Sequence, residues 1–254
     1  MKLISVLTNI GIKKVLIYKE FLFFSALKNI LNLTVQYYLW TQVIKVNSSI
    51  GSINDLMLYF TITQSMSILF PRVGMEMSSD MISGDIVHKL VKPISIVKQY
   101  FFESLGSTIA KLISIFVINL LLIILFSENV NTVKSIYLVI LFVLGYILNF
   151  TIEIFFGALS FFTQSLWGIE SLKNGLLLIL SGGVFPIALY PEWLKPILNY
   201  LPFSYSYGKI AEAYMGNVGI IDVLVPQIIF IFVIYIIYRV VSSLGLKRIA
   251  INGG

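Results

Sequence analysis

Few side chains in this chain could do chemistry, and they do not form a catalytic constellation. His88 is the only histidine and cysteine is absent, which excludes a zinc-binding histidine pair and a thiolate nucleophile. Ser181 precedes Gly182, but the histidine that a serine nucleophile needs lies in a distant charged loop. The sequence has no glycine-rich phosphate loop, so we do not expect the chain itself to hydrolyse ATP. We therefore expect no catalytic residue, no metal site and no cofactor bound by this chain.

The composition indicates a membrane protein. Of the 254 residues, 58% are hydrophobic and 12% are charged, and the mean hydropathy is +0.93. A soluble protein of this size could not bury so much apolar surface. The apolar residues form long runs between short polar gaps, which predicts an all-α protein with several membrane spans. In such a protein the net charge of +6 reflects basic cytoplasmic loops, and we expect no nucleic-acid partner.

Six spans are expected in a single transmembrane domain over residues 21–254. Every run except the fifth has the roughly 20 residues needed to cross the hydrocarbon layer. The fifth contains SGGVFP at 181–186, where two glycines and a proline should break the helix. The expected spans are about 21–44, 56–74, 100–126, 134–163, 172–190 and 222–242.

Residues 1–20 are too interrupted to span a membrane. Their apolar and polar residues separate onto two helical faces, which favours an interfacial amphipathic helix over a disordered cationic tail. The lysines would face anionic lipid headgroups. The expected apolar face consists of Leu3, Val6, Leu7 and Ile10.

Residues 191–217 are too apolar for an ordinary loop and too rich in proline for a span. We expect two short helices that dip back into the outer leaflet, with their broken backbone shielded by protein. Trp193 and several tyrosines in this reentrant segment suit a membrane interface.

Basic residues predict the orientation. With six spans, twelve of the eighteen lysines and arginines, Arg72 and Lys173 among them, fall on the side of both termini, four fall on the other side and two lie inside spans. Since cytoplasmic loops carry the excess of Lys and Arg, both termini and the 75–99 loop are expected in the cytoplasm. We expect the chain in the plasma (inner) membrane.

The charged stretch SGDIVHKLVKP, residues 83–93, opens with a glycine and closes with a proline. These boundaries predict a short helix on the cytoplasmic side, capped by Ser83 or Asp80. Its apolar side would consist of Ile86, Val87 and Leu90.

This stretch resembles the cytoplasmic coupling element of ABC type-2 exporter permeases, in the six-span branch with a G-D-I-x-x-x-L-x-x-P block. A second block, residues 180–216, resembles the broken fifth span, P-x-W-L segment, L-P-F turn and terminal glycine of the same family. The sequence departs from the family at Ile82, where members often carry a basic residue. The first match rests on Gly84, Asp85, Ile86, Leu90 and Pro93, and the second on Ser181, Gly182, Pro186, Pro191, Trp193, Leu194, Leu201, Pro202, Phe203 and Gly216.

The resemblance implies a permease subunit. Two permeases, identical or paralogous, would form the pathway, and two separate ATPase subunits that hold ATP and Mg would dock below and move the loops. The docking residues implied are Gly84, Asp85, Ile86, His88, Lys89, Leu90 and Pro93. The implied extracellular gate in and around the reentrant segment comprises Gly182, Gly183, Pro186, Trp193, Pro202 and Phe203. The spans have few polar groups, which favours lipid-like, peptide or amphiphilic cargo over a small sugar.

Three charges, Lys28, Lys111 and Glu153, fall inside expected spans. Lys28 can snorkel to the inner interface. Lys111 and Glu153 lie at nearly equal depths of about 17 and 15 Å, counted at about 1.5 Å per residue. An unpaired charge there costs at least about 2.5–3.5 kcal/mol, so we expect these two to pair. The pair would be either a static structural contact or a lock that breaks during transport.

Two other functions fit the same sequence. One is a secondary transporter coupled to ions or protons through Glu153, although no second half mirrors the broken fifth span. The other is a membrane assembly or immunity protein that transports nothing. In that case residues 83–93 could be a solvated loop that only connects two spans.

Overall fold

The computed structural model describes residues 2–47, 50–112, 117–126, 132–163 and 166–252. Within these ranges the regular elements are helices and no strand occurs, so the predicted all-α fold is confirmed. The helices are α1 (Lys2–Ile17), α2 (Lys19–Val46), α3 (Ile53–Leu69), α4 (Val73–Ser83), α5 (Ile86–Leu90), α6 (Ile96–Lys111), α7 (Val117–Phe126), α8 (Thr132–Leu159), α9 (Leu166–Leu180), the 3-10 turn η3 (Ile187–Leu189), α10 (Leu194–Asn199), α11 (Pro202–Ser206), α12 (Gly208–Met215) and α13 (Ile220–Asn252).

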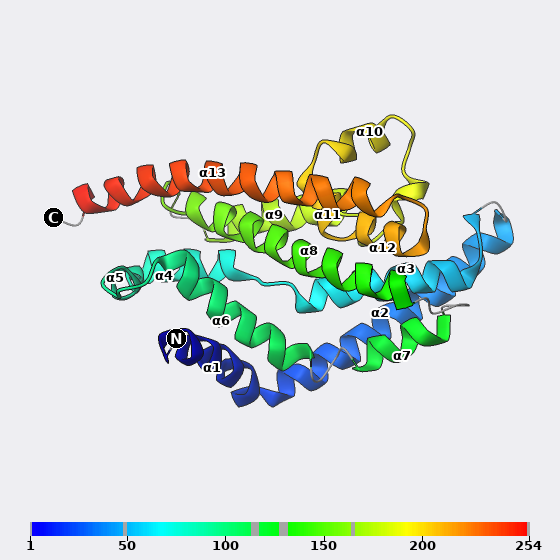
Figure 1. Cartoon of the computed structure of the whole chain (residues 1–254), viewed down its shortest axis with the longest axis horizontal. Helices are drawn as coiled ribbons and strands as arrows, with labels where there is room; N and C mark the ends of the chain where they lie inside the picture. Colours follow the sequence, from blue (N-terminus) through cyan, green and yellow to red (C-terminus); the bar gives the residue numbers. More distant parts are fainter. Residues whose placement is uncertain (1, 48–49, 113–116, 127–131, 164–165, 253–254) are drawn as a thin grey trace.

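Helix α8 is the central element of the molecule. It contacts α4, α9, α11 and α12, and α13 packs alongside it (Figure 1). Its polar residues Asn149, Thr151 and Glu153 are buried, whereas α13 and α2 expose many large apolar side chains. Apolar surface of this extent is covered by lipid or by another protein. The arrangement therefore suits a membrane, with α8 inside and α2 and α13 outside.

Each predicted span overlaps one or two helices of the described residues, but several bounds differ. The second span ends at Leu69 and not near residue 74, because Pro71 follows. The residue before a proline avoids the helical region, and Phe70 is extended with ψ 148°. A new helix, α4, then begins at Val73. The predicted break of the fifth span is confirmed, since α9 ends at Leu180.

The third predicted span falls on two helices, α6 and α7, on either side of residues 113–116, which lie outside the described residues. Within the described part of the chain, two helical stretches, Val133–Leu159 and Ile220–Gly245, are long and apolar enough to cross a membrane. The count of six spans therefore remains a prediction.

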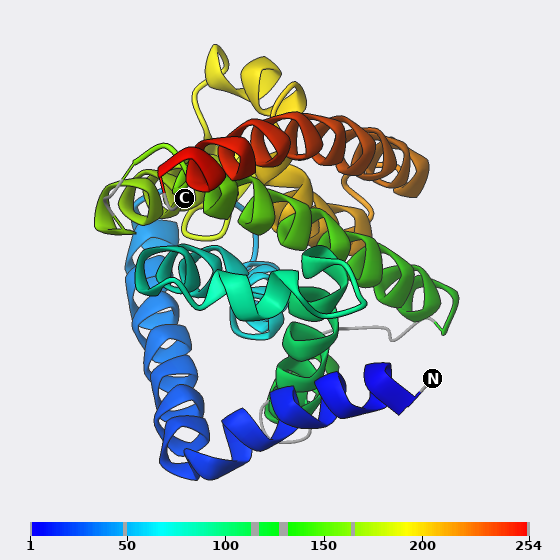
Figure 2. The same cartoon turned by 90° about the vertical axis from the view of Figure 1, so that its left-hand side faces the viewer.

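Helix α1 turns away from α2 at Tyr18 and lies across one end of the molecule (Figure 2). Of the predicted apolar face only Leu7 is buried. The side of α1 that packs on α6 carries Leu7, Gly11 and Val15, which are spaced by four residues. Leu3, Val6 and Ile10 are exposed, so an apolar surface remains for the predicted interfacial location.

The start of α1, the end of α13 and α5 lie toward the same end of the long axis, and the end of α2 lies at the other (Figure 1). This arrangement fits the prediction that both termini and the 75–99 loop share one side of a membrane. A small apolar core lies beneath α5 at this end, formed by Val73, Met77, Ile86, Tyr100, Phe150, Ile154, Ala158, Phe161 and Tyr238.

Candidate functional site

The charged stretch forms a compact helical corner. Gly84 ends α4 in the left-handed region at φ +83°, a conformation that other residues rarely adopt. The Ser83 hydroxyl donates to Asp85 Oδ2 at 2.8 Å, and α5 begins at Ile86. The predicted helix between Gly84 and Pro93 is confirmed. The predicted cap is wrong, since no side chain caps α5.

The apolar residues of α5 point in two directions. Ile86 is 1% exposed and belongs to the small core against α6 and α8. In contrast, Val87, Leu90 and Val91 are exposed. Ile86 therefore holds α5 in place, while the other three offer an apolar surface to a partner. His88 and Pro93 are also exposed.

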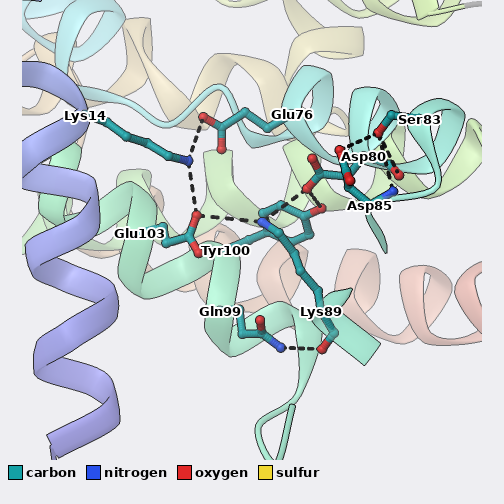
Figure 3. A network of polar contacts seen from close by, with 9 residues as sticks. All are labelled: Lys14, Glu76, Asp80, Ser83, Asp85, Lys89, Gln99, Tyr100 and Glu103. Carbon is teal, nitrogen blue, oxygen red and sulfur yellow. Dashed lines mark hydrogen bonds and ion pairs between the residues drawn. The ribbon is translucent and has the colours of Figure 1, made fainter. Parts of the chain in front are cut away.

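Lys89 is turned inward and does not face solvent. Its ammonium lies 3.1 Å from Asp80 Oδ2 and 3.7 Å from Glu103 Oε2, and 3.8 Å from the centre of the Tyr100 ring. The Tyr100 hydroxyl donates to the same Asp80 carboxylate at 2.6 Å. Figure 3 shows these groups converging between α4, α5 and α6. Lys89 thus fixes α5 to its neighbours and leaves little of its charge for a partner protein.

Helix α1 joins the same network through Lys14 (Figure 3). Its ammonium lies 3.2 Å from Glu103 Oε2 and 3.8 Å from Glu76 Oε1. Burial by itself would lower the pKa of Lys14, but the Glu76 and Glu103 carboxylates outweigh burial and raise it. Lys14 therefore stays charged at neutral pH. The carboxylate of Glu103 is the shared point, because it contacts both lysines.

An amide closes the loop after α5. Gln99, at the start of α6, donates through Nε2 to the carbonyl oxygens of Lys89 at 2.7 Å and Ile94 at 2.9 Å. The main chain around Pro93 is thereby tied to α6. Together with Lys14 and Lys89, this contact makes α1, α4, α5 and α6 one connected unit, here called the coupling corner.

A second ion cluster lies inside the helical bundle. Glu153 Oε1 accepts from Lys173 at 2.6 Å, and Glu153 Oε2 accepts from the Gly74 N–H at 2.8 Å. Lys173 also lies 2.9 Å from Glu170 on the same helix. The cluster connects α4, α8 and α9, and the Glu153 and Lys173 side chains are almost fully buried.

The expected pair of Lys111 and Glu153 is therefore wrong, because Glu153 pairs with Lys173. The count of basic residues assigned Lys173 to the cytoplasmic side, since the predicted fifth span began near residue 172 and Lys173 would lie at its cytoplasmic end. Helix α9 begins at Leu166 instead and carries Lys173 into the bundle. The acid at Glu170, one helical turn earlier, was the sequence signal for this cluster.

Lys28 and Lys111 line a different cavity. They surround a space of about 360 Å³ together with Arg72 from the α3–α4 connection. The count of basic residues assigned Arg72 to the cytoplasmic side, at the end of the second predicted span, and did not connect it with Lys28 and Lys111. No carboxylate of the described residues forms an ion pair with any of the three.

The segment after α9 folds tightly against α3. Gly182 has φ +75°, and its carbonyl oxygen accepts from the Tyr59 hydroxyl at 2.7 Å. The Gly208 N–H donates to Ser181 O at 2.9 Å and closes the segment. Residues 191–217 contain three helices, α10, α11 and α12, and not the two expected, because Tyr207 has non-helical backbone angles between α11 and α12.

The predicted gate residues in and around this segment divide by burial. Pro186 and Phe203 are buried, Gly182 is enclosed, and Pro202 begins α11 at its first turn. Trp193 is exposed, and Gly183 donates its N–H to Ser181 Oγ at 3.1 Å. Gly182, Pro186 and Phe203 are therefore inside the fold, whereas Trp193 is available to the surroundings.

The helical fold, the exposed apolar helices and the coupling corner define a membrane protein whose helices are tied to a charged segment at one end. A family model described as ABC-2 family transporter protein matches residues 30–253. The chain therefore belongs to this family, as the sequence resemblance predicted. No curated protein and no solved structure matches the chain.

Proposed function

We propose that the chain is the permease subunit of an ATP-driven exporter and that α5 docks on a separate ATPase subunit. The observation that supports this most is the exposed apolar surface of Val87, Leu90 and Val91, with Ile82 on the preceding helix. These residues occupy a charged segment at the end of the molecule that holds the start of α1 and the end of α13 (Figure 1). Large apolar side chains grouped in such a polar setting are typical of a protein contact.

The coupling corner provides a route from this surface into the bundle. Lys89 joins α5 to α4 and α6, and Lys14 joins α6 to α1. From α4, the Gly74 N–H reaches Glu153 on α8 and, through it, Lys173 on α9. A displacement of α5 by ATP-driven closure of the ATPase subunits would move these helices as connected bodies.

The same contacts weigh against the secondary-transporter alternative. Both carboxylate oxygens of Glu153 have partners, Lys173 and the Gly74 N–H. A proton carrier needs a carboxylate that is free to take up and release a proton, whereas this one is almost fully buried and held by both contacts. We therefore propose a structural and coupling role for Glu153, with transport powered by ATP on the partner.

We further propose that two permease chains form the pathway and that the α9–α12 segment closes it on the outer side. Helices α2 and α13 expose enough apolar surface for both lipid and a second chain. At the segment, the Tyr59 hydroxyl holds Gly182, and Ile187 packs against both Gly182 and Gly208. Movement of α3, which carries Tyr59, would therefore loosen this closure.

Docking is tested by placing a charge on the apolar surface. Leu90→Asp and Val87→Asp should weaken association with the ATPase by about 1–3 kcal/mol, because a charge is buried where an apolar contact was. The measurement is the amount of ATPase that co-purifies with the tagged full chain from its own membranes.

Tyr200→Asp is the matched control. Tyr200 is also a large exposed side chain, but it ends α10, away from α5. This variant should retain wild-type amounts of ATPase. Wild-type ATPase recovery with both α5 variants, each eluting as a folded protein in size-exclusion chromatography, would contradict the docking proposal.

A further inference from the structure

The cavity between α2, α3 and α6 has a charge pattern that differs from its surroundings. Three cations line it, Lys28, Arg72 and Lys111, together with the polar side chains of Ser25, Asn29, Asn32, Gln64 and Ser67. No acidic residue of the described part of the chain lines it. Its volume of about 360 Å³ lies within the usual range for small-ligand sites.

The neighbouring cavities show that this pattern is local. Arg72 also lines a cavity with Glu153, Glu170 and Lys173, and Lys111 also lines one with Glu76 and Glu103. Among the described residues, acidic side chains therefore line the two cavities that share Arg72 or Lys111 with the cationic cavity, but they do not line the cationic cavity itself. Three like charges facing one space repel each other, and an anion in that space would relieve the repulsion.

The position of Lys28 indicates what surrounds this anion. Lys28 is exposed on α2 among the large apolar side chains of Phe23, Phe24, Leu27 and Leu31, which are exposed as well. A charge in such a setting is costly unless it reaches water or a ligand of opposite charge. Phe24 itself lines the cavity, so the polar space opens beside an apolar surface.

Asn29 is one of the polar residues that line the cavity. Asn29 is buried and donates through Nδ2 to Asn119 at 2.6 Å, while its Oδ1 has no hydrogen-bond partner in the described part of the chain. The contact with Asn119 fixes this polar residue at the wall of the cavity.

We infer that this cavity binds the phosphate-type head group of an anionic amphiphile, whose apolar chains lie along α2. Arg72 can bind two phosphate oxygens in a bidentate manner, and the two lysines add point charges. The apolar residues of α2 match the chains of such a molecule. Binding of such a molecule does not depend on the proposed function. Only its role, as cargo or as a lipid that supports transport, rests on the proposed function.

Binding is tested on the full chain alone, purified in an uncharged detergent. The probes are dihexanoyl phosphatidylglycerol, dihexanoyl phosphatidylcholine of the same chain length, and inorganic phosphate. The measurements are the shift of the thermal unfolding midpoint and the number of adducts in native mass spectrometry. We expect binding of phosphatidylglycerol, and weaker or no binding of the zwitterionic lipid and of free phosphate.

The test variant is Arg72→Gln with Lys111→Gln. It should lose about tenfold or more in affinity for phosphatidylglycerol, because two charge-assisted contacts are removed. The matched control is Lys45→Gln with Lys98→Gln, which removes the same charge at exposed positions outside the cavity. The control should bind as the wild type does.

Three results would overturn the inference or a defined part of it. If the variant and the wild type bind phosphatidylglycerol with equal affinity, the cavity is not the binding site. Equal binding of phosphatidylcholine would remove the requirement for an anion. If inorganic phosphate binds as tightly as the lipid, the ligand of the cavity is a soluble anion and not an amphiphile. Because no ATPase takes part, failure here leaves docking untouched, and failure of docking leaves this result valid.

Discussion

The Lys173 ammonium pairs with two acids, Glu153 and Glu170. Removing the lysine should therefore cost more stability than removing one of the acids. Lys173→Met leaves Glu153 and Glu170 without their common cation, whereas Glu153→Gln leaves Lys173 still paired with Glu170. Breaking a buried pair by removing one partner costs about 3–5 kcal/mol. We expect Lys173→Met to approach this cost and Glu153→Gln to cost clearly less. Thermal unfolding of the detergent-purified chain measures both.

A double-mutant cycle identifies the true partner of Glu153. Glu153→Gln combined with Lys173→Met should be more stable than the sum of the single effects predicts, since the two residues are in contact. Glu153→Gln combined with Lys111→Met should be additive, because Lys111 lines a different cavity. Additivity in the first cycle, or coupling in the second, would contradict the observed pairing.

At the scale of elements, α1 and α6 approach so closely that only glycine fits at the crossing. A Cβ added to Gly11 would overlap the carbonyl oxygen of Glu103, and one added to Gly106 would overlap that of Thr8. Gly11→Ala and Gly106→Ala should therefore each destabilise the chain by about 1–3 kcal/mol, since the added methyl group would force the backbones of the two helices apart. The shift of the unfolding midpoint measures this cost.

Gly175→Ala on α9 provides the control for that prediction. No atom lies within 4 Å of a Cβ added there, so alanine should be neutral or stabilise the helix by up to about 1 kcal/mol. If Gly11→Ala and Gly106→Ala behave as Gly175→Ala does, α1 does not pack on α6 in this way and cannot belong to the coupling corner.

The short helix α5 shows what the sequence could and could not predict about an element. Its boundaries followed from Gly84 and Pro93, because both residues restrict the backbone locally. The direction of its side chains did not follow, since Ile86 is buried by the α6 and α8 residues around it and Lys89 is turned inward by Asp80 and Glu103. These partners come from other helices, whose positions depend on the whole fold.

For the whole molecule, composition and motif order were sufficient for the helical class and the family, because both depend on the chain alone. The division of the second span at Pro71 was readable in principle from its local geometry. In contrast, the pairing of Glu153 with Lys173 depends on which residues of α8 and α9 face each other. Residue counts gave the depths of Lys111 and Glu153 along the membrane normal. They do not determine how each helix is rotated about its axis, and this rotation decides which side chains meet.

Orientation can be tested across the whole molecule, because the natural chain has no cysteine. Val46, Val91 and Tyr200 are among its most exposed side chains. We expect a membrane-impermeant maleimide on intact cells to label Val46→Cys and Tyr200→Cys, and to label Val91→Cys only after permeabilisation. Helices α3, α4 and the short α5 connect Val46 to Val91 within the described residues, so opposite labelling requires that this stretch of the chain crosses the membrane. Labelling of Val91→Cys on intact cells would show that α5 lies on the outer side, where a cytoplasmic ATPase cannot bind it.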